Sequence, residues 1–287
     1  MRTLCATVAS AMLAASSAAA AGPSEVWRAE GLSTPESVAH DPTQDVLYVS
    51  NVAGEAMAKD GKGFISRLSP DGKIVALEWA TGLDAPKGMA VVGERLYVSD
   101  IDELVAIDTK SGAIANSWPA AGAKFLNDVA ADAEGRVFVS DMMTNRIWLL
   151  DGDSFALWLE DARLENPNGL KVAGDKLIVA SWGVMAEDFS TKVPGHLLAV
   201  DLASKEIADF GDPKPVGNLD GLESDGAGGW YVSDWMAGGL YHVGPDGRAE
   251  QILDLEQGSA DIGIIPGDKV VLVPMMMQGT VVAYRVE

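Results

Sequence analysis

The sequence predicts an all-β protein, a six-bladed β-propeller with four antiparallel strands in each blade. Three observations support this fold: a short β-rich motif recurs six times, a second motif precedes each copy, and turn-forming residues separate the strands. No stretch shows the hydrophobic period of an amphipathic helix. Several strands in a unit that repeats about every 40–50 residues are typical of propeller blades.

The first motif is a pair of apolar or aromatic residues followed by Val-Ser and a polar residue. Four copies are clear, and two others carry Ala-Ser or Val-Pro but are equally rich in β-forming residues. We expect each copy to form the second strand of a blade. The six copies are Leu47–Asn51, Leu96–Asp100, Val137–Asp141, Ile178–Trp182, Trp230–Asp234 and Val271–Met275.

The second motif lies ahead of each copy and begins the first strand of the blade. Its leading residues follow one another at intervals of 51, 40, 41, 52 and 41 residues. The first strand of a blade runs nearest the propeller axis, so these side chains should meet at one mouth of the central channel. The six leading residues are Glu36, Lys87, Asn127, Asn168, Asp220 and Asp261.

Blades one and four are longer than the others, and the extra residues, 51–62 and 182–194, follow the second strand in each case. An antiparallel second strand ends on the face where the first strand begins. Both loops should therefore overhang the mouth that holds the leading residues. Blades one and four face each other across a ring of six, so the loops would form two rims.

The last blade ends with its third strand, Thr280–Val286, and needs a fourth strand from elsewhere. Val26-Trp27 near the N-terminus resembles Glu78-Trp79, which falls in the fourth-strand position of blade one. We therefore expect the N-terminal segment to pair with the last blade. Such closure removes the unpaired edges that an open sheet would expose.

The first 21 residues have the layout of a secretory signal peptide, with Arg2, an apolar run and small residues up to Ala21. We expect residues 1–21 to be this signal and residues 22–287 to be the propeller domain, in a periplasmic or secreted protein. The single cysteine, Cys5, lies in the signal, so the mature chain would have no disulfide. No later run approaches the roughly 20 apolar residues of a membrane helix, so no membrane partner is expected.

The chain is acidic, with a formal net charge of −21. This charge argues against a nucleic acid partner and favours solubility and the attraction of cations. No motif indicates a protein partner, although a protein-binding role stays open. The expected partner is a small-molecule substrate.

The leading column contains four oxygen donors that converge from four blades, namely Glu36, Asn127, Asn168 and Asp220. Oxygen donors with two carboxylates among them are the ligands that a hard divalent cation such as calcium requires. Each residue alone could instead cap the local backbone at the start of a strand. The convergence of all four in one column favours a metal site.

These motifs resemble those of the SMP-30/gluconolactonase/LRE-like propellers, and the resemblance covers the whole mature chain. The segments that carry it are Pro35-Glu36, Asn127-Asp128 with Asp132-x-x-Gly135, Pro167–Leu170 and Asp220–Leu222. The resemblance implies a catalytic divalent cation held by Glu36, Asn168 and Asp220, with Asn127 near the bound water or substrate. Calcium is the first candidate, and zinc, manganese and magnesium are the alternatives.

The activity that the resemblance implies is hydrolysis of a lactone or a related ester. The metal would polarise the carbonyl and lower the pKa of a bound water. Asp220 would act as the general base, and Asn127 completes the catalytic pair. Asp128 could orient Asn127 or the water, or serve only in a turn.

Two departures from the family pattern concern the substrate. Many sugar lactonases of the family carry an arginine two residues before the asparagine that matches Asn127, and this chain has Phe125 there. Lys87 places an ammonium among the leading residues, where it could anchor an anionic substrate, pair with Asp261 or weaken metal binding. The ion pair is the interpretation that we favour.

The candidates for substrate binding are Lys87, Asp128, Trp182 and Asp261. Trp182 belongs to a group of large apolar residues that follow second strands and could line an apolar pocket on the mouth side. The others are Met142, Met143, Trp235 and Met275–Met277.

Two alternatives to a lactonase stay open. A propeller of this kind could bind a ligand or a protein without catalysis, because the fold hosts both classes of function. The same metal chemistry would also serve hydrolysis of phosphotriesters.

Overall fold

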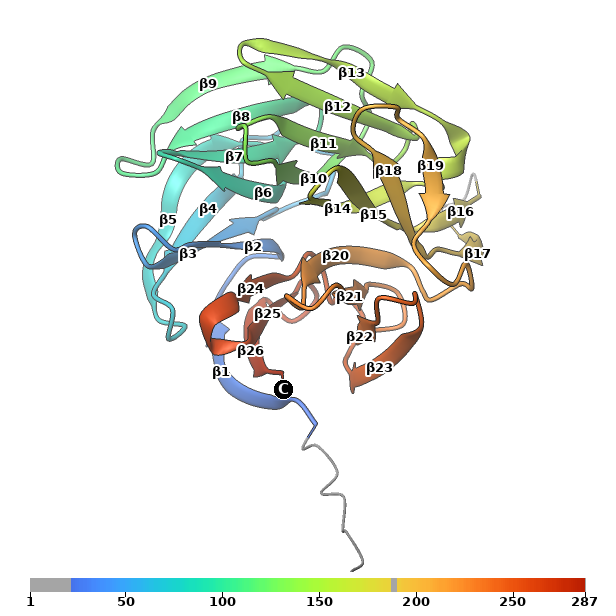
Figure 1. Ribbon diagram of the computed structural model, residues 1–287. Coiled ribbons are helices and arrows are strands. Elements are labelled where there is room, and N and C mark those ends of the chain that lie inside the picture. Colours follow the sequence, from blue (N-terminus) through green and yellow to red (C-terminus); the bar gives the residue numbers. More distant parts are fainter. Residues whose placement is uncertain (1–21, 187–189, 287) are drawn as a thin grey trace, which may run out of the picture.

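The computed structural model describes residues 22–186 and 190–286, and these residues form a closed ring of six four-stranded antiparallel sheets (Figure 1). The predicted six-bladed β-propeller is therefore confirmed. Within these residues, no helix is long and apolar enough to cross a membrane. The predicted signal peptide, residues 1–21, lies outside the described residues.

Each blade is built from strands that follow one another in the sequence, from the channel outward, with two exceptions: an inserted hairpin interrupts blade four, and the last blade takes its outer strand from the N-terminus. Blades one to three comprise β2 (Pro35–Asp41), β3 (Val46–Asn51), β4 (Gly63–Leu68) and β5 (Ile74–Leu83); β6 (Pro86–Val92), β7 (Arg95–Asp100), β8 (Glu103–Asp108) and β9 (Ile114–Pro119); and β10 (Leu126–Ala131), β11 (Val137–Asp141), β12 (Arg146–Asp151) and β13 (Ser154–Glu160).

The second half of the ring repeats this arrangement. Its blades comprise β14 (Pro167–Ala173), β15 (Lys176–Ser181), β18 (Leu197–Asp201) and β19 (Ile207–Asp209); β20 (Leu219–Ser224), β21 (Trp230–Asp234), β22 (Gly239–Val243) and β23 (Ala249–Asp254); and β24 (Gly263–Ile265), β25 (Val270–Met275), β26 (Thr280–Arg285) and β1 (Ser24–Glu30). The insertion in blade four contains a small hairpin, β16 (Gly183–Met185) and β17 (Thr191–Pro194), and two 3-10 turns lie at Ala162–Leu164 and Pro266–Asp268.

Closure of the ring follows the prediction: β1 pairs antiparallel with β26 and completes the last blade (Figure 1). The closing strand also contacts blade one, because the Trp27 indole donates a hydrogen bond to the carbonyl of Pro70 (3.0 Å). Gly72, in the same turn, has a positive φ of 83°, and a Cβ there would lie 2.4 Å from the Trp27 ring. Trp27 therefore fastens the last blade to the first.

The hydrophobic core lies between neighbouring blades. Buried Tyr48 and Ile65 of blade one, for example, form one cluster with Met89 and Leu96 of blade two. The alternation of side chains along each strand supplies apolar residues to both faces of every sheet, so each blade packs on two neighbours.

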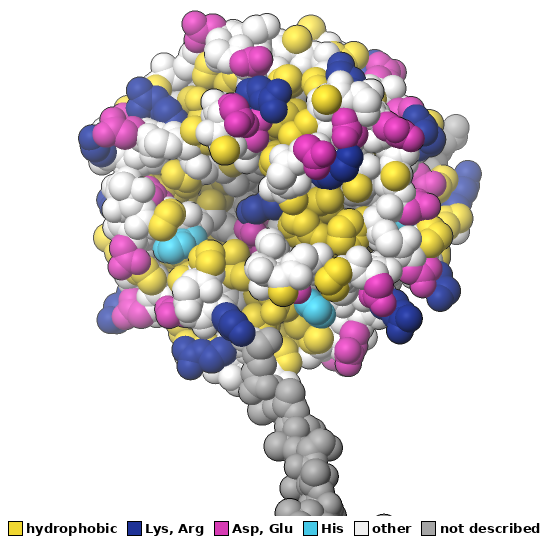
Figure 2. All heavy atoms as spheres, viewed as in Figure 1, with side chains coloured by type: hydrophobic (Ala, Val, Ile, Leu, Met, Phe, Trp, Pro, Cys, Tyr) yellow, Lys and Arg dark blue, Asp and Glu magenta, His cyan; other side chains and the backbone are white. Residues whose placement is uncertain are grey.

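The ring has two different faces. On the site face, first strands begin and second strands end; on the opposite face, short hairpins join first to second strands. On the face shown in Figure 2, the ring is hollowed at its centre, and acidic and basic side chains there lie within a border of hydrophobic ones. A cavity of about 480 Å³ opens on the site face and one of about 850 Å³ on the opposite face.

Trp27→Ala should test the closure. Loss of the indole removes packing against blade one and its hydrogen bond, so we expect the free energy of unfolding to fall by about 2–3 kcal/mol. The matched control is Val26→Ala, because Val26 is exposed and lies at a break in the β1–β26 register. Thermal unfolding followed by circular dichroism measures both variants, and equal melting temperatures for the two would contradict the assigned role of Trp27.

Candidate functional site

In five of the six blades, a β-bulge turns the leading side chain of the first strand toward the channel. In blade three, Leu126 pairs with Asp141 but Val129 pairs with Val139, so one extra residue is accommodated between them. Bulges re-aim side chains and are common beside active sites. The same register shift occurs at the start of β2, β6, β14 and β20.

The serine of the Val-Ser motif holds this geometry in place. The Ser140 hydroxyl accepts a hydrogen bond from the backbone nitrogen of Asp128 and donates one to the carbonyl of Asn168 in the next blade (2.9 and 2.8 Å). Ser233 contacts Gly221 N and Ala260 O in the same way, with distances of 2.9 and 2.8 Å. The recurrent serine therefore links the leading residues of adjacent blades, and its role is structural.

The polar residue after the serine also has a structural role. Asp100 accepts hydrogen bonds from the backbone nitrogens of Asp84 and Ala85 (2.8 and 2.7 Å), just before the next first strand. Asp141 accepts one from Phe125 in the equivalent place (3.0 Å). These carboxylates fix the loops that lead into the first strands.

The sixth leading position is occupied by Ala260, so the assignment of Asp261 to this column is wrong by one residue. Ser233 donates to Ala260 O, as Ser140 donates to Asn168 O. Blade six has Pro274, and blade four has Ala180, where the other blades have the serine. In blade six, the backbone nitrogen of Asp261 instead donates to Glu36 O (2.9 Å). Asp261 therefore lies one residue deeper in the channel, beside Ser37.

The other five leading residues are brought together, as predicted, at the floor of the site-face cavity. None is more than 5% exposed. Both long loops contribute to the walls, with Val52 and Ala56 from blade one and Trp182 and Met185 from blade four. The two predicted rims are thus present around this mouth.

Four polar atoms at this floor are buried without a hydrogen-bond partner. They are Glu36 Oε2, Asp220 Oδ1, and both Oδ1 and Nδ2 of Asn168. The fourth predicted ligand, Asn127, uses its amide nitrogen to contact Met142 Sδ (3.8 Å). Buried polar atoms are normally paired, so these atoms fit a site that binds a polar ligand or a cation.

The floor carries strong electrostatic repulsion. Burial raises the pKa of Glu36 well above its ordinary value, and the charge of Asp220 adds to this increase. Burial likewise raises the pKa of Asp220, the charge of Asp261 adds to this increase, and the neighbouring Asn168 amide opposes it. A bound cation would favour the ionised form of both carboxyl groups.

Lys87 does not form the predicted ion pair with Asp261. Its ammonium donates to the carbonyls of Ala56 (3.0 Å) and Ala85 (2.9 Å) and lies 4.5 Å from the centre of the Phe125 ring. Burial lowers the pKa of Lys87, while the nearby charge of Glu36 opposes this shift. The one-residue offset of Asp261 explains why the two side chains do not meet.

Asp128 and Asp261 line the cavity on the opposite face instead of the site-face cavity. Asp128 accepts hydrogen bonds from the backbone nitrogens of Val129 (2.6 Å) and Leu170 (2.5 Å), and its burial raises its pKa to about 7. Asp261 accepts a hydrogen bond from the Ser37 hydroxyl (2.5 Å). Their proposed contact with a substrate at the site face has no geometric support.

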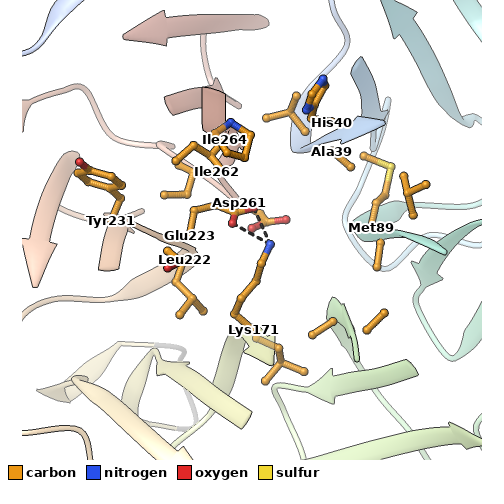
Figure 3. A pocket seen from close by; sticks show the side chains of 18 of the residues that line it. Ala39, His40, Met89, Lys171, Leu222, Glu223, Tyr231, Asp261, Ile262 and Ile264 are labelled. Atoms are coloured by element: carbon orange, nitrogen blue, oxygen red, sulfur yellow. Dashed lines mark hydrogen bonds and ion pairs between the residues drawn. The ribbon is translucent and has the colours of Figure 1, made fainter. Parts of the chain in front are cut away.

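Sequence reasoning missed an ion pair in this opposite cavity. Lys171 extends toward Glu223 and Asp261, and its ammonium lies 2.7 Å from the Glu223 carboxylate (Figure 3). The ammonium is deep in the ring yet faces the cavity. A signal was available, because Lys171 and Glu223 each follow the leading residue of their blade by three positions.

Most of the apolar candidates line the site-face cavity, including Trp182, Trp235, Met142, Met143 and Met276. Met275 is buried in the core, and Met277 is 67% exposed. Wall residues that the sequence did not single out are Val52, Ala56, Met185, Met236 and Gln257. They lie in loops whose path no repeat motif defines.

No family model matches the chain, and no curated protein matches it. Several solved structures do match the chain. A gluconolactonase from Xanthomonas campestris superimposes with a TM-score of 0.71 at 14% identity, over 92% of this chain and 89% of that chain. A putative gluconolactonase superimposes with a TM-score of 0.65 at 16% identity, over 94% of this chain and 93% of that chain.

A virginiamycin B lyase from Staphylococcus aureus, solved with quinupristin, superimposes with a TM-score of 0.61 at 12% identity, over 91% of this chain and 99% of that chain. Identities this low establish the fold and nothing finer. Gluconolactonases and streptogramin-type lyases are thus both structural neighbours of this six-bladed propeller.

Asp220→Asn should stabilise the cation-free protein increasingly as the pH rises from 5 to 8. The folded-state pKa of Asp220 is raised above its unfolded value, so its contribution to stability is present at low pH and lost as the pH rises through the folded pKa. Asparagine removes this loss, which reaches about 1.4 kcal/mol per pH unit between the two pKa values.

Melting temperatures in the presence of a chelator, at pH 5, 6.5 and 8, test this expectation. Asp153→Asn is the matched control, because Asp153 is exposed in a turn. A stability difference between Asp220→Asn and the parent that does not change with pH would show that Asp220 is not held at an electrostatic cost.

Proposed function

We propose that this protein is a cation-dependent hydrolase of lactones or small esters. The observation that carries the proposal is the set of unpartnered polar atoms on Glu36, Asn168 and Asp220 at the floor of the site-face cavity. The gluconolactonase neighbours support a small-molecule substrate and a place among the SMP-30/gluconolactonase/LRE-like propellers. A signal peptide over residues 1–21 would direct the enzyme to the periplasm or the exterior.

The residues that would hold the cation are Glu36, Asn127, Asn168 and Asp220. All four offer oxygen, and no histidine or cysteine lines this cavity among the described residues. Oxygen donors with a flexible amide component suit calcium, whereas zinc prefers nitrogen and sulfur. Calcium is therefore the ion that we propose, ahead of magnesium, manganese and zinc.

When bound, the cation would polarise the substrate carbonyl and make a water more acidic. Asp220 would accept the proton of the attacking water, because one of its carboxylate oxygens is free of hydrogen bonds. Asn127 would orient the substrate carbonyl, since its amide is fixed against Met142. The acyl C–O bond then breaks, and the leaving oxygen takes up a proton to give a hydroxy acid or an alcohol.

Lys87 would add a positive charge beside this centre. Glu36 and Asp220 together balance a divalent cation, so the nearby ammonium leaves the floor with net positive charge. Such a field would favour the negative charge that develops on the carbonyl oxygen during attack. The cost is weaker cation binding, because like charges repel.

An elimination reaction of the lyase type has less support. A histidine-to-alanine variant of the Staphylococcus aureus lyase is described as catalytically inactive. In this chain, His40 and His242 line the opposite cavity, and His196 pairs with Asp209 (2.9 Å). The site-face cavity therefore lacks a histidine that could take an equivalent part.

One observation favours a non-catalytic binding propeller as the second candidate. The buried ammonium of Lys87 already lies in the field of Glu36 and raises the electrostatic cost of a second cation at the floor. The same cavity could then bind an organic ligand without a metal. Metal content separates this candidate from the hydrolase.

We expect the purified protein to bind about one calcium ion per chain, measured by isothermal titration calorimetry after chelation and dialysis. Asp220→Asn and Glu36→Gln should each weaken binding at least about 100-fold, because each removes an anionic ligand. Asp153→Asn should bind like the parent. Protein that takes up no calcium at millimolar concentration would exclude the cation-dependent hydrolase.

Lys87→Met should separate the two effects of the ammonium. Without it, calcium should bind about tenfold more tightly, because a like charge is removed, while kcat for lactone hydrolysis should fall. Lys59→Met is the control, since Lys59 lies in the loop that supplies Ala56 but pairs with Asp102 at the surface (2.6 Å). Unchanged calcium affinity in Lys87→Met would contradict the proposed charge balance.

A further inference from the structure

The walls of the site-face cavity are almost entirely apolar. Five methionines, two tryptophans and one phenylalanine surround the polar floor: Met142, Met143, Met185, Met236, Met276, Trp182, Trp235 and Phe125. Val52 and Ala56 complete the apolar part, and Gln257 is the single polar side chain on the wall. The cavity therefore has a polar reaction centre below an apolar compartment.

The polar groups of the wall are already used within the protein. Trp235 Nε1 donates to Met276 Sδ (3.2 Å), and the Gln257 amide donates to Met236 Sδ (3.7 Å). Lys87, which could serve a substrate hydroxyl or anion, has two backbone carbonyls as acceptors. Among the described wall residues, Trp182 Nε1 alone is a buried donor without a partner.

A sugar lactone fits this compartment poorly. Its ring carries several hydroxyl groups, and each hydroxyl that leaves water without a new partner disfavours binding. The single free indole donor of Trp182 can form a hydrogen bond with only one hydroxyl group of a polyol. Phe125, whose ring is covered by the Lys87 ammonium, contributes an apolar surface where a donor would be needed.

An alkyl or aryl group fits the same walls well. Methionine side chains are flexible and polarisable, so they adapt to chains and rings of different shape and make favourable contacts with aromatic groups. Trp182 and Trp235, whose ring centroids are 6.1 Å apart, add a rigid apolar surface. The two long loops carry Val52 and Met185 to this compartment, so they extend the apolar wall outward.

We propose that the substrate of this site is a lactone or ester with an alkyl or aryl substituent, and that polyhydroxylated lactones are excluded. The inference rests on the proposed hydrolase function for the reaction but not for the binding of the apolar group. The substituent lies against the methionine and tryptophan walls, while the carbonyl faces the floor formed by Glu36, Asn127, Asn168 and Asp220.

The first test compares δ-decalactone, δ-valerolactone and glucono-δ-lactone as substrates of the calcium-loaded parent protein. Each buried methylene favours binding about fourfold. The pentyl chain of δ-decalactone should therefore raise kcat/KM at least about 30-fold over δ-valerolactone, and glucono-δ-lactone should be the poorest of the three. A second arm measures binding of δ-decalactone to the chelated protein by calorimetry, where no hydrolysis occurs.

Two adjacent methionines offer a matched pair of variants. Met276 lines the cavity, whereas Met277 is 67% exposed and lies outside it. Met276→Gln should weaken the binding of δ-decalactone to the chelated protein at least about fivefold. Met277→Gln should leave this binding unchanged. The chain-length series in the parent protein stands independently if Met276→Gln fails to fold.

The outcomes separate this inference from the proposed function. Binding of δ-decalactone without turnover of any lactone supports the apolar ligand class and overturns the hydrolase. Turnover that is independent of chain length, or that favours glucono-δ-lactone, overturns the apolar substrate class while the hydrolase stands. Absence of both δ-decalactone turnover in the first arm and δ-decalactone binding in the second also overturns the inference.

Discussion

The site depends on a hydrogen bond between neighbouring blades, in which a buried serine hydroxyl of one second strand reaches the carbonyl of the next leading residue. Ser140 and Ser233 each accept from the bulge of their own blade and donate to the next. A bulge would otherwise leave backbone groups unpaired inside the ring. Because these groups are paired, five polar side chains can be held at the channel mouth in fixed positions.

Bringing these side chains together buries carboxyl groups close to one another, and this lowers the stability of the folded protein when they are ionised. Glu36 and Asp220 share the buried floor, and their pKa values are raised by burial and by neighbouring carboxyl groups. The charge of Lys87 offsets part of this cost at Glu36, and the charge of Lys171 acts in the same way on Asp128 and Asp261 at the opposite face. A divalent cation bound at the floor, as we propose, would offset the remainder.

The repeat made much of the fold predictable, because five blades share the same bulge and four share the same serine. The position of Glu36, Asn127, Asn168 and Asp220 followed from that repeat. Asp261 was misplaced because Pro274 breaks the Val-Ser pattern and hides the offset of one residue in blade six. The contacts of Lys87 could not be predicted either, since its acceptors are backbone carbonyls and one of them lies in an irregular loop.

The site-face cavity is divided into a polar floor and apolar walls, and this division follows from the propeller fold. First strands supply the floor through the repeat, and the loops after second strands supply most of the walls. The most direct test is a crystal structure at neutral pH with millimolar calcium. We expect one ion at about 2.3–2.6 Å from oxygens of Glu36, Asn127, Asn168 and Asp220. A floor without an ion, in which the ammonium of Lys87 contacts Glu36, would contradict the proposed cation site.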